Sequence, residues 1–252
     1  MNLTGMLTFT KRDILRFLKV INQTLFPPIV STLLFLAVFH FVLGRGGGVS
    51  SYSYLEFLVP GLAMMSVIRN SFANSSSSLF ISKFTNHFQH ILTMPLSYFE
   101  IATAYVLGAM ARGLLTAAGI FIAVGFFVQL HLHSIAIMIL FFLLASFMFG
   151  SLGILAALWA EEFDHLGIFN TFVLTPLTML GGVFYSISML PEQYQILTKF
   201  NPIFFLVDGF RYGMLGIKDH SIIFGAILSL ALAILSFVLV VWLMKKGWKV
   251  KE

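Results

Sequence analysis

Two stripes of polar side chains run along segments of the chain that are otherwise apolar. The first holds Ser66, Asn70, Asn74 and Ser77 or Ser78, with Arg69 beside it; the second holds Thr171, Thr175 and Thr178, with Asn170 adjacent. Residues three and four apart share one side of a helix, so each stripe predicts one polar helix face. Such a face either joins helices through hydrogen bonds within lipid or lines a water-filled path. Both interpretations stay open at this point.

Other residues that could do chemistry form weaker patterns. His87 and His90 give H-x-x-H and His131 and His133 give H-x-H, but neither pair has a carboxylate close by in sequence, as zinc sites often do. The acidic run EEFDH at 161–165 falls on a short turn. The chain has no cysteine and no G-x-x-x-x-G-K-[ST] phosphate loop. The sequence therefore predicts no catalytic, metal or cofactor site, and no ATP hydrolysis by this chain alone.

The composition places these residues in a membrane protein. Of the 252 residues, 59% are hydrophobic and 10% charged, whereas soluble domains average about 25% charged residues. About 20 apolar residues are needed to cross a bilayer as a helix. Six runs are long enough, and they predict an all-α protein with a single transmembrane domain over 1–252. The predicted spans are 25–43, 57–80, 101–130, 135–159, 166–185 and 222–244.

The basic residues indicate the orientation of the spans rather than binding to nucleic acid, because they lie at the ends of apolar runs. An even number of spans puts both termini on one side. With the termini inside, nine Lys and Arg are cytosolic and four are outside, which favours cytosolic termini under the positive-inside rule. The chain shows no internal repeat, which argues against a secondary transporter.

The N-terminal segment 1–23 predicts an amphipathic helix on the inner membrane surface. Its predicted apolar face holds Ile14, Leu18, Ile21 and Leu25, and the opposite side holds Lys11, Arg12, Arg16, Lys19 and Gln23. A plain basic flank without a partner is the alternative.

The loop between the second and third predicted spans contains a further helix that ends before Pro95, because the residue before a proline avoids helical geometry. Phe84, Phe88, Ile91 and Leu92 fall on one face of it. That apolar face needs burial, either within the chain or against a partner.

Between the fifth and sixth spans, 191–216 predicts two short helices. Asn201 can cap the second, Pro202 can open it and Gly216 can close it. At about 15 and 21 Å, neither crosses a hydrocarbon core of about 30 Å, so the pair is expected to enter the membrane from outside and return. Asp208 and Arg211 stand three residues apart and are expected to pair.

The sequence also resembles the type-2 permease family of ABC transporters over essentially its whole length. The most specific stretch is GGVFYSISMLPEQYQILTKFNPIFFLVDGFRYGMLG at 181–216. The family's first span is similar to LFPPIVSTLLFLAVF, and its second span to FLVPGLAMMSVI. The segment that joins the family's second and third spans is similar to ILTMPLSYFEI. The nearest likeness is to stand-alone bacterial inner-membrane permeases paired with a separate ATPase. Where the family often has Glu before the joining segment, this chain has Gln89 and His90, which puts a charge contact at that point in doubt.

The resemblance implies a permease subunit of an ABC exporter and not an enzyme. It implies a homodimer in the inner membrane with two cytosolic ATPase subunits, which would bind the ATP and Mg²⁺. The segment with Phe84, Phe88, Gln89, His90, Ile91 and Leu92 would then be the coupling helix. Arg69, Asn70, Asn74, Thr171, Thr175 and Thr178 would face the translocation path. An ATP-independent channel or secondary transporter is the alternative function, an intramembrane enzyme is a third, and the substrate is not specified by the sequence.

Overall fold

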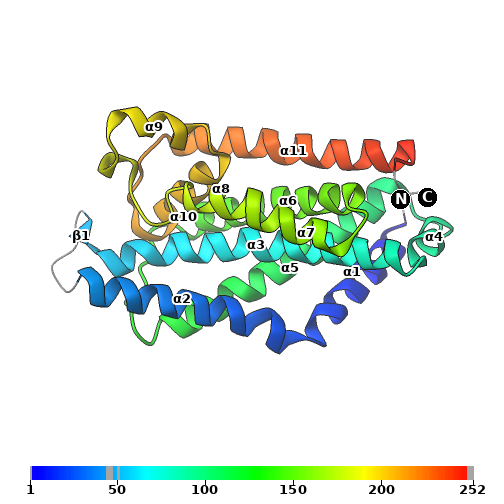
Figure 1. The fold of residues 1–252 in the computed structure, drawn as a ribbon, viewed down its shortest axis with the longest axis horizontal. Helices are drawn as coiled ribbons and strands as arrows, with labels where there is room; N and C mark the ends of the chain where they lie inside the picture. The colour runs from blue at the N-terminus through cyan, green and yellow to red at the C-terminus, as the bar shows by residue number, and fades with distance from the viewer. Residues whose placement is uncertain (1, 44–47, 50–51, 249–252) are drawn as a thin grey trace.

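The computed structural model describes residues 2–43, 48–49 and 52–248 as an almost entirely helical protein (Figure 1). The longer helices are α1 Leu3–Leu18, α2 Ile21–Leu43, α3 Tyr54–Phe84, α5 Tyr98–Val124, α6 Ile135–Trp159, α10 Pro202–Leu215 and α11 Ile222–Lys246. The shorter ones are α4 His87–Leu92, α7 Phe163–Phe169, α8 Thr175–Met179 and α9 Glu192–Lys199. A π-helical turn, Asn170–Leu174, joins α7 to α8, and a 3₁₀ turn covers Ile187–Met189. Strands β1 Gly48–Val49 and β2 Tyr52–Ser53 form a small antiparallel pair.

Helix α3 forms the centre of the bundle and packs mainly against α6 and α5. Glycine permits the closest approach between α3 and α6. A Cβ atom added at Gly153 would lie only 2.5 Å from the carbonyl oxygen of Phe72. Without a side chain at this position, the two backbones meet and the apolar side chains above and below interdigitate.

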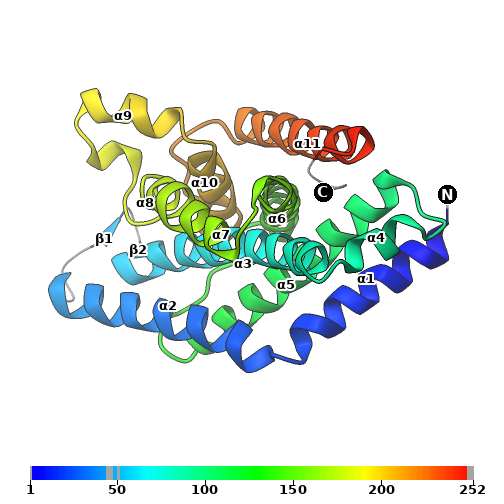
Figure 2. The same ribbon diagram turned by 45° about the vertical axis from the view of Figure 1, so that its right-hand side comes forward.

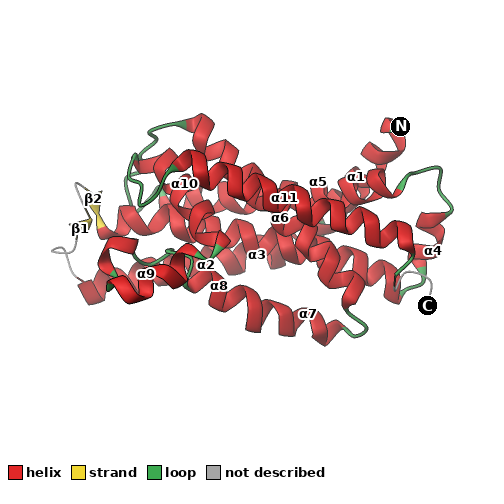
Figure 3. Ribbon diagram, turned by 90° about the horizontal axis from the view of Figure 1, so that it is seen from above, coloured by secondary structure: helices red, strands yellow, loops and turns green. Residues whose placement is uncertain are grey.

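Four described helices are long and apolar enough to cross a membrane: Ile21–Val42, Tyr98–Val124, Ile135–Trp159 and Ile222–Lys246. They correspond to four of the six predicted spans. The second predicted span lies within α3, which has 31 residues but a C-terminal half rich in serine and asparagine. The fifth is a helical run made of α7, the π-helical turn and α8 (Figure 3).

Two predicted span boundaries were too long. The third was expected to continue to residue 130, but α5 ends at Val124, and the fifth was expected to reach residue 185, but α8 ends at Met179. In both places apolar residues continue into a turn. Hydropathy therefore does not mark the end of the helix there, whereas the glycines at 125 and at 181–182 do.

The prediction for the N-terminal helix was right about the helix and wrong about its buried face. Helix α1 ends at Leu18, so Ile21 and Leu25 belong to α2, which leaves in another direction (Figure 2). The side of α1 that packs against α5 holds Met6, Phe9, Thr10, Asp13 and Phe17. Ile14 and Leu18 are only partly buried.

The two short helices predicted in 191–216 are present as α9 and α10. The Asn201 side chain accepts a hydrogen bond from the N–H of Ile203, Pro202 occupies the first turn, and Gly216 closes α10 with a φ of 73°. A left-handed residue is the usual way to end a helix, and glycine adopts it without strain. In Figure 1 this hairpin lies at the opposite end of the bundle from α4, the start of α1 and the end of α11.

Candidate functional site

The structure brings part of the two predicted polar stripes together. The guanidinium Nη2 of Arg69 on α3 lies 3.3 Å from Thr175 Oγ1 and 3.4 Å from Thr178 Oγ1 on α8. The Arg69 side chain is half-buried, and its Nε has no hydrogen-bond partner among the described residues. Thr171, one turn before Thr175, is exposed. A positive charge and several hydroxyl groups thus gather at the contact between α3 and the α7–α8 run.

The two asparagines of the first stripe do not lie on an open surface. Asn70 is 9% exposed and donates to the carbonyl of Ser66 one turn back. Asn74 is fully buried, and its Nδ2 donates to Asp13 Oδ2 at 2.8 Å. The prediction that Asn74 faces a path is therefore wrong for this chain by itself, because α1 covers it. For Asn70 the path stays a prediction.

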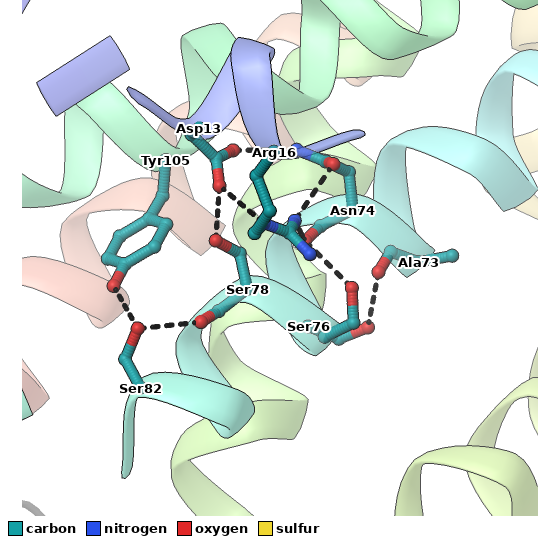
Figure 4. A network of polar contacts seen from close by, with 9 residues as sticks. Asp13, Arg16, Ala73, Asn74, Ser76, Ser78, Ser82 and Tyr105 are labelled. Atoms are coloured by element: carbon teal, nitrogen blue, oxygen red, sulfur yellow. Dashed lines mark hydrogen bonds and ion pairs between the residues drawn. The ribbon is translucent and has the colours of Figure 1, made fainter. Parts of the chain in front are cut away.

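Asp13 of α1 is the centre of a buried polar network (Figure 4). It is 1% exposed, and its carboxylate accepts hydrogen bonds from Ser78 Oγ, from Asn74 Nδ2 and from Arg16 Nε, the last at 3.2 Å. Arg16 also donates to Asn74 Oδ1 at 3.1 Å. These contacts fix α1 to the middle of α3.

Sequence reasoning passed over Asp13 because it stands in a basic stretch. One pattern could have revealed it: Phe9, Asp13 and Phe17 are spaced four apart, so the acid lies on the apolar face of α1. The polar network also reaches α5, where Tyr105 Oη donates to Ser82 Oγ at 3.4 Å. An acid on an apolar face needs partners, and the hydroxyl-rich half of α3 supplies them.

Part of the apolar face of the predicted coupling segment is buried within the chain, and Leu92 is partly buried. Phe88 is 2% exposed and Ile91 fully buried, both in the same core as α3 and α5. The hypothesis that Phe88 inserts into a partner is therefore wrong, because its own chain already occupies that surface. Gln89 and His90 are exposed, and Phe84 is 78% exposed at the end of α3. These three side chains lie on the accessible surface of the segment.

The predicted pair of Asp208 and Arg211 does not form. Both side chains are buried, yet within the part of the chain that the structure describes they make no ion pair with each other. The Asp208 carboxylate accepts the backbone N–H groups of Asp219 and His220 at 2.8 and 3.0 Å. Arg211 Nη2 donates to the carbonyls of Gly182 and Val183. Backbone groups outside the helix thus replace the partner expected from spacing.

Arg211 makes a further contact besides its hydrogen bonds. Its Cζ lies 3.9 Å from the ring centroid of Phe57, a cation–π contact with α3. The pair therefore attaches the hairpin to its neighbours on two sides.

The histidine patterns give no metal centre in the described residues, where no group of three or more His, Cys, Asp or Glu is close enough to hold an ion. The fold does supply a carboxylate that the sequence did not place. His131 Nε2 lies 2.9 Å from Glu56 Oε1, and Glu56 also accepts the N–H of Ser53 in a capping box at the start of α3. This contact ties the loop after α5 to the start of α3.

Comparisons with known proteins agree with this arrangement. A family model described as "ABC-2 type transporter" matches residues 4–215. The inner membrane transport permease YadH of Escherichia coli K12 is 40% identical over 240 residues, which cover 94% of this chain and 93% of YadH. Nodulation protein J of Rhizobium leguminosarum bv. viciae is 24% identical over 185 residues, 71% of each chain. Nodulation protein J of Rhizobium meliloti is 23% identical over 212 residues, 82% of this chain and 79% of that protein.

Proposed function

Because the chain belongs to the ABC-2 type transporter family, we propose that it is the permease subunit of an ATP-driven exporter. The chain is a multi-pass inner-membrane transport subunit. The finer proposal is that two copies enclose the translocation path and that two separate cytosolic ATPase subunits drive them. The observation that carries it is the family match across the bundle, together with an accessible polar and aromatic surface at α4.

We infer six spans, the four apolar helices plus α3 and the α7–α8 run. With 31 residues, α3 measures about 46 Å and is long enough to cross the bilayer. Asn74, Ser78 and Ser82 in its polar half are satisfied by α1 and by its own backbone, which is how polar groups are tolerated at membrane depth. The start of α1 and the end of α11 lie at one end of the bundle (Figure 1), as an even number requires. The charge count makes that end cytosolic.

The contact with the ATPase is proposed on the exposed side of α4 and the end of α3. Phe88 and Ile91 anchor α4 in the core, and α4 packs against α3, so a push on this surface reaches α3 directly. Gln89, His90 and Phe84 provide the side chains that a partner would touch. The hairpin of α9 and α10 is proposed to be re-entrant from the outer side.

The path is proposed to run beside the contact of Arg69 with Thr175 and Thr178. Thr171 and the neighbouring exposed side chains of the α7–α8 run would face the second copy or the path. In this proposal Asn74 has a structural role.

The test is co-expression of the full-length chain with each ABC ATPase subunit of its source organism. We expect a complex of two permeases and two ATPases by mass, with ATP hydrolysis that depends on the permease. Gln89→Ala with His90→Ala should release the ATPase, whereas Gln193→Ala, exposed on α9 at the other end, should not. Flux through proteoliposomes of the purified chain alone, without ATP, would instead favour the channel.

A further inference from the structure

A cavity of about 680 Å³ lies between α1 and the end of α3, within the range of small-molecule sites. Its lining includes three basic side chains, Arg12, Arg16 and Lys19 of α1. Hydroxyl-bearing side chains line the opposite wall, namely Ser78, Ser82 and Thr85. The transport proposal assigns no ligand to these groups.

The charge of the cavity is strongly positive even after its internal pair is counted. Three cations line it, and among the residues that the structure describes Asp13 is the one carboxylate paired with them, accepting from Arg16. Three positive charges less one leave a net charge of +2. A phosphate monoester carries about −1.5 to −2 at neutral pH. The Arg12 Cζ lies 4.2 Å from the ring centroid of Phe9, and a guanidinium suits phosphate oxygens.

The apolar residues that line the cavity indicate which chemical group would accompany the phosphate. Leu15, Leu18 and Ile81 give the cavity an apolar side. Leu15 is 48% exposed and Ile81 41% exposed, so this side is open to the surroundings of the bundle. A charged floor next to an open apolar wall fits an amphiphile, with its head on the cations and its tail along α1 and α3.

We propose that this cavity binds the phosphate headgroup of an anionic lipid at the cytosolic end of the bundle. Basic pockets between membrane helices on the cytosolic side recognise such headgroups through the same chemistry. A bound lipid would bridge α1 to α3 beside the Asp13 network, so it would stabilise their contact. The inference goes beyond transport and does not depend on an ATPase.

The experiment uses the full-length chain in detergent and measures retained lipid by native mass spectrometry. The probe is dioctanoyl-phosphatidic acid, compared with dioctanoyl-phosphatidylcholine and with inorganic phosphate. Arg12→Gln with Lys19→Gln removes two charges from the cavity and leaves Arg16, which Asp13 needs. Lys245→Gln with Lys246→Gln removes two charges from the last turn of α11 and is the matched control.

We expect phosphatidic acid to bind at least tenfold more weakly to the cavity variant and less than twofold more weakly to the control. Phosphatidylcholine should bind weakly to all forms. If phosphatidic acid bound equally more weakly to both variants, general attraction to basic residues would explain the binding and the proposed site would be wrong. The proposed site would also be wrong if neither variant bound the lipid more weakly. If inorganic phosphate displaced phosphatidic acid at an equal concentration, the proposal of a lipid ligand would be wrong, and the cavity would be assigned to free phosphate. Lys19→Gln alone, at an exposed position, should weaken binding about threefold and keeps the test valid if the double variant misfolds.

Discussion

Replacing Asp13 with alanine should loosen α1 from the bundle without unfolding the spans. Without the carboxylate, the Asn74 amide and the Ser78 hydroxyl lose their acceptor in a buried place, and an unsatisfied buried donor costs about 1–3 kcal/mol. The Arg16 side chain is 35% exposed and can turn to solvent, so its lost pair adds little. The sum is about 3 kcal/mol, which raises the population of detached α1 about 100-fold.

Limited trypsin digestion of the full-length protein in detergent measures this population. Cleavage after Lys11, Arg12 or Arg16 requires α1 to open, because a protease binds an extended backbone. Where reclosing is faster than cleavage, the rate follows the population of the open form. Cleavage after Lys245 and Lys246, at the end of α11, serves as the internal reference. We expect the ratio of the two rates to rise about 100-fold in Asp13→Ala.

A second substitution reaches the same network from α5. A Cβ atom at Gly108 would collide with the Asp13 carboxylate, so Gly108→Ala should also speed cleavage of α1. Gly167→Ala is the control, since nothing lies within 4 Å of an added Cβ there. If Asp13→Ala and Gly108→Ala both left α1 as resistant as in the unmodified chain, the network would not be what holds α1.

Four further outcomes follow from the structure. Phe88→Ala should cost about 3–5 kcal/mol and lower the yield of folded protein in gel filtration, because its ring is buried in the chain's own core, while His90→Ala should leave the yield unchanged. Arg211→Leu leaves the carbonyls of Gly182 and Val183 without a buried donor and should lower the thermal midpoint by about 4–8 °C for a loss of about 2 kcal/mol; an unchanged midpoint would show that water replaces the guanidinium. Thr171→Trp should change substrate-stimulated ATP hydrolysis of the assembled transporter while dimer yield stays constant; reduced yield with normal activity per dimer would assign Thr171 to packing. An epitope after Lys218 should be labelled from outside intact spheroplasts, and labelling only after permeabilisation would reverse the proposed orientation.

The long helices could be predicted from the sequence because a lipid environment permits few backbone structures. Backbone groups in hydrocarbon must be satisfied within the segment, so a long apolar run predicts a helix reliably. The ends of α10 were also predictable, since Asn201, Pro202 and Gly216 determine the local backbone. Helix ends that fall inside apolar stretches could not be predicted, as the early end of α5 at Val124 shows.

The contact partners of the buried side chains could not be predicted from sequence spacing. Asp208 and Arg211 share a helix face, but backbone N–H and carbonyl groups from distant segments outcompete that short-range pair. The apolar face of α4 could pack either within the chain or against a partner. Phe88 and Ile91 are buried in the chain's own core, so the first alternative holds for these two residues. Asp13 and Asn74 lie 61 positions apart, and no local pattern relates them.

The contacts of α3 suggest how motion would travel through the subunit. At its N-terminal end, Tyr54 Oη donates to the carbonyl of Phe184, and at its C-terminal end Lys83 Nζ donates to the carbonyls of Ala157, Leu158 and Ala160. The latter hydrogen bonds satisfy the last turn of α6, where a cation is favoured. The Lys83 hydrogen bonds and the close approach at Gly153 both join α3 to α6, so these two helices should move as one rigid unit.

The α7–α8 run is held to that unit more lightly, and Arg69 with the two threonines supplies the polar part of the contact. These hydrogen bonds are long, 3.3 and 3.4 Å, and α7 is mostly exposed. The π-helical turn at Asn170–Leu174 adds a place where the helix can change its winding. A force applied at α4 would therefore move α3 and α6 together and displace them against α7 and α8. The contact at Arg69 is then where the subunit would open, and it lies beside the proposed path.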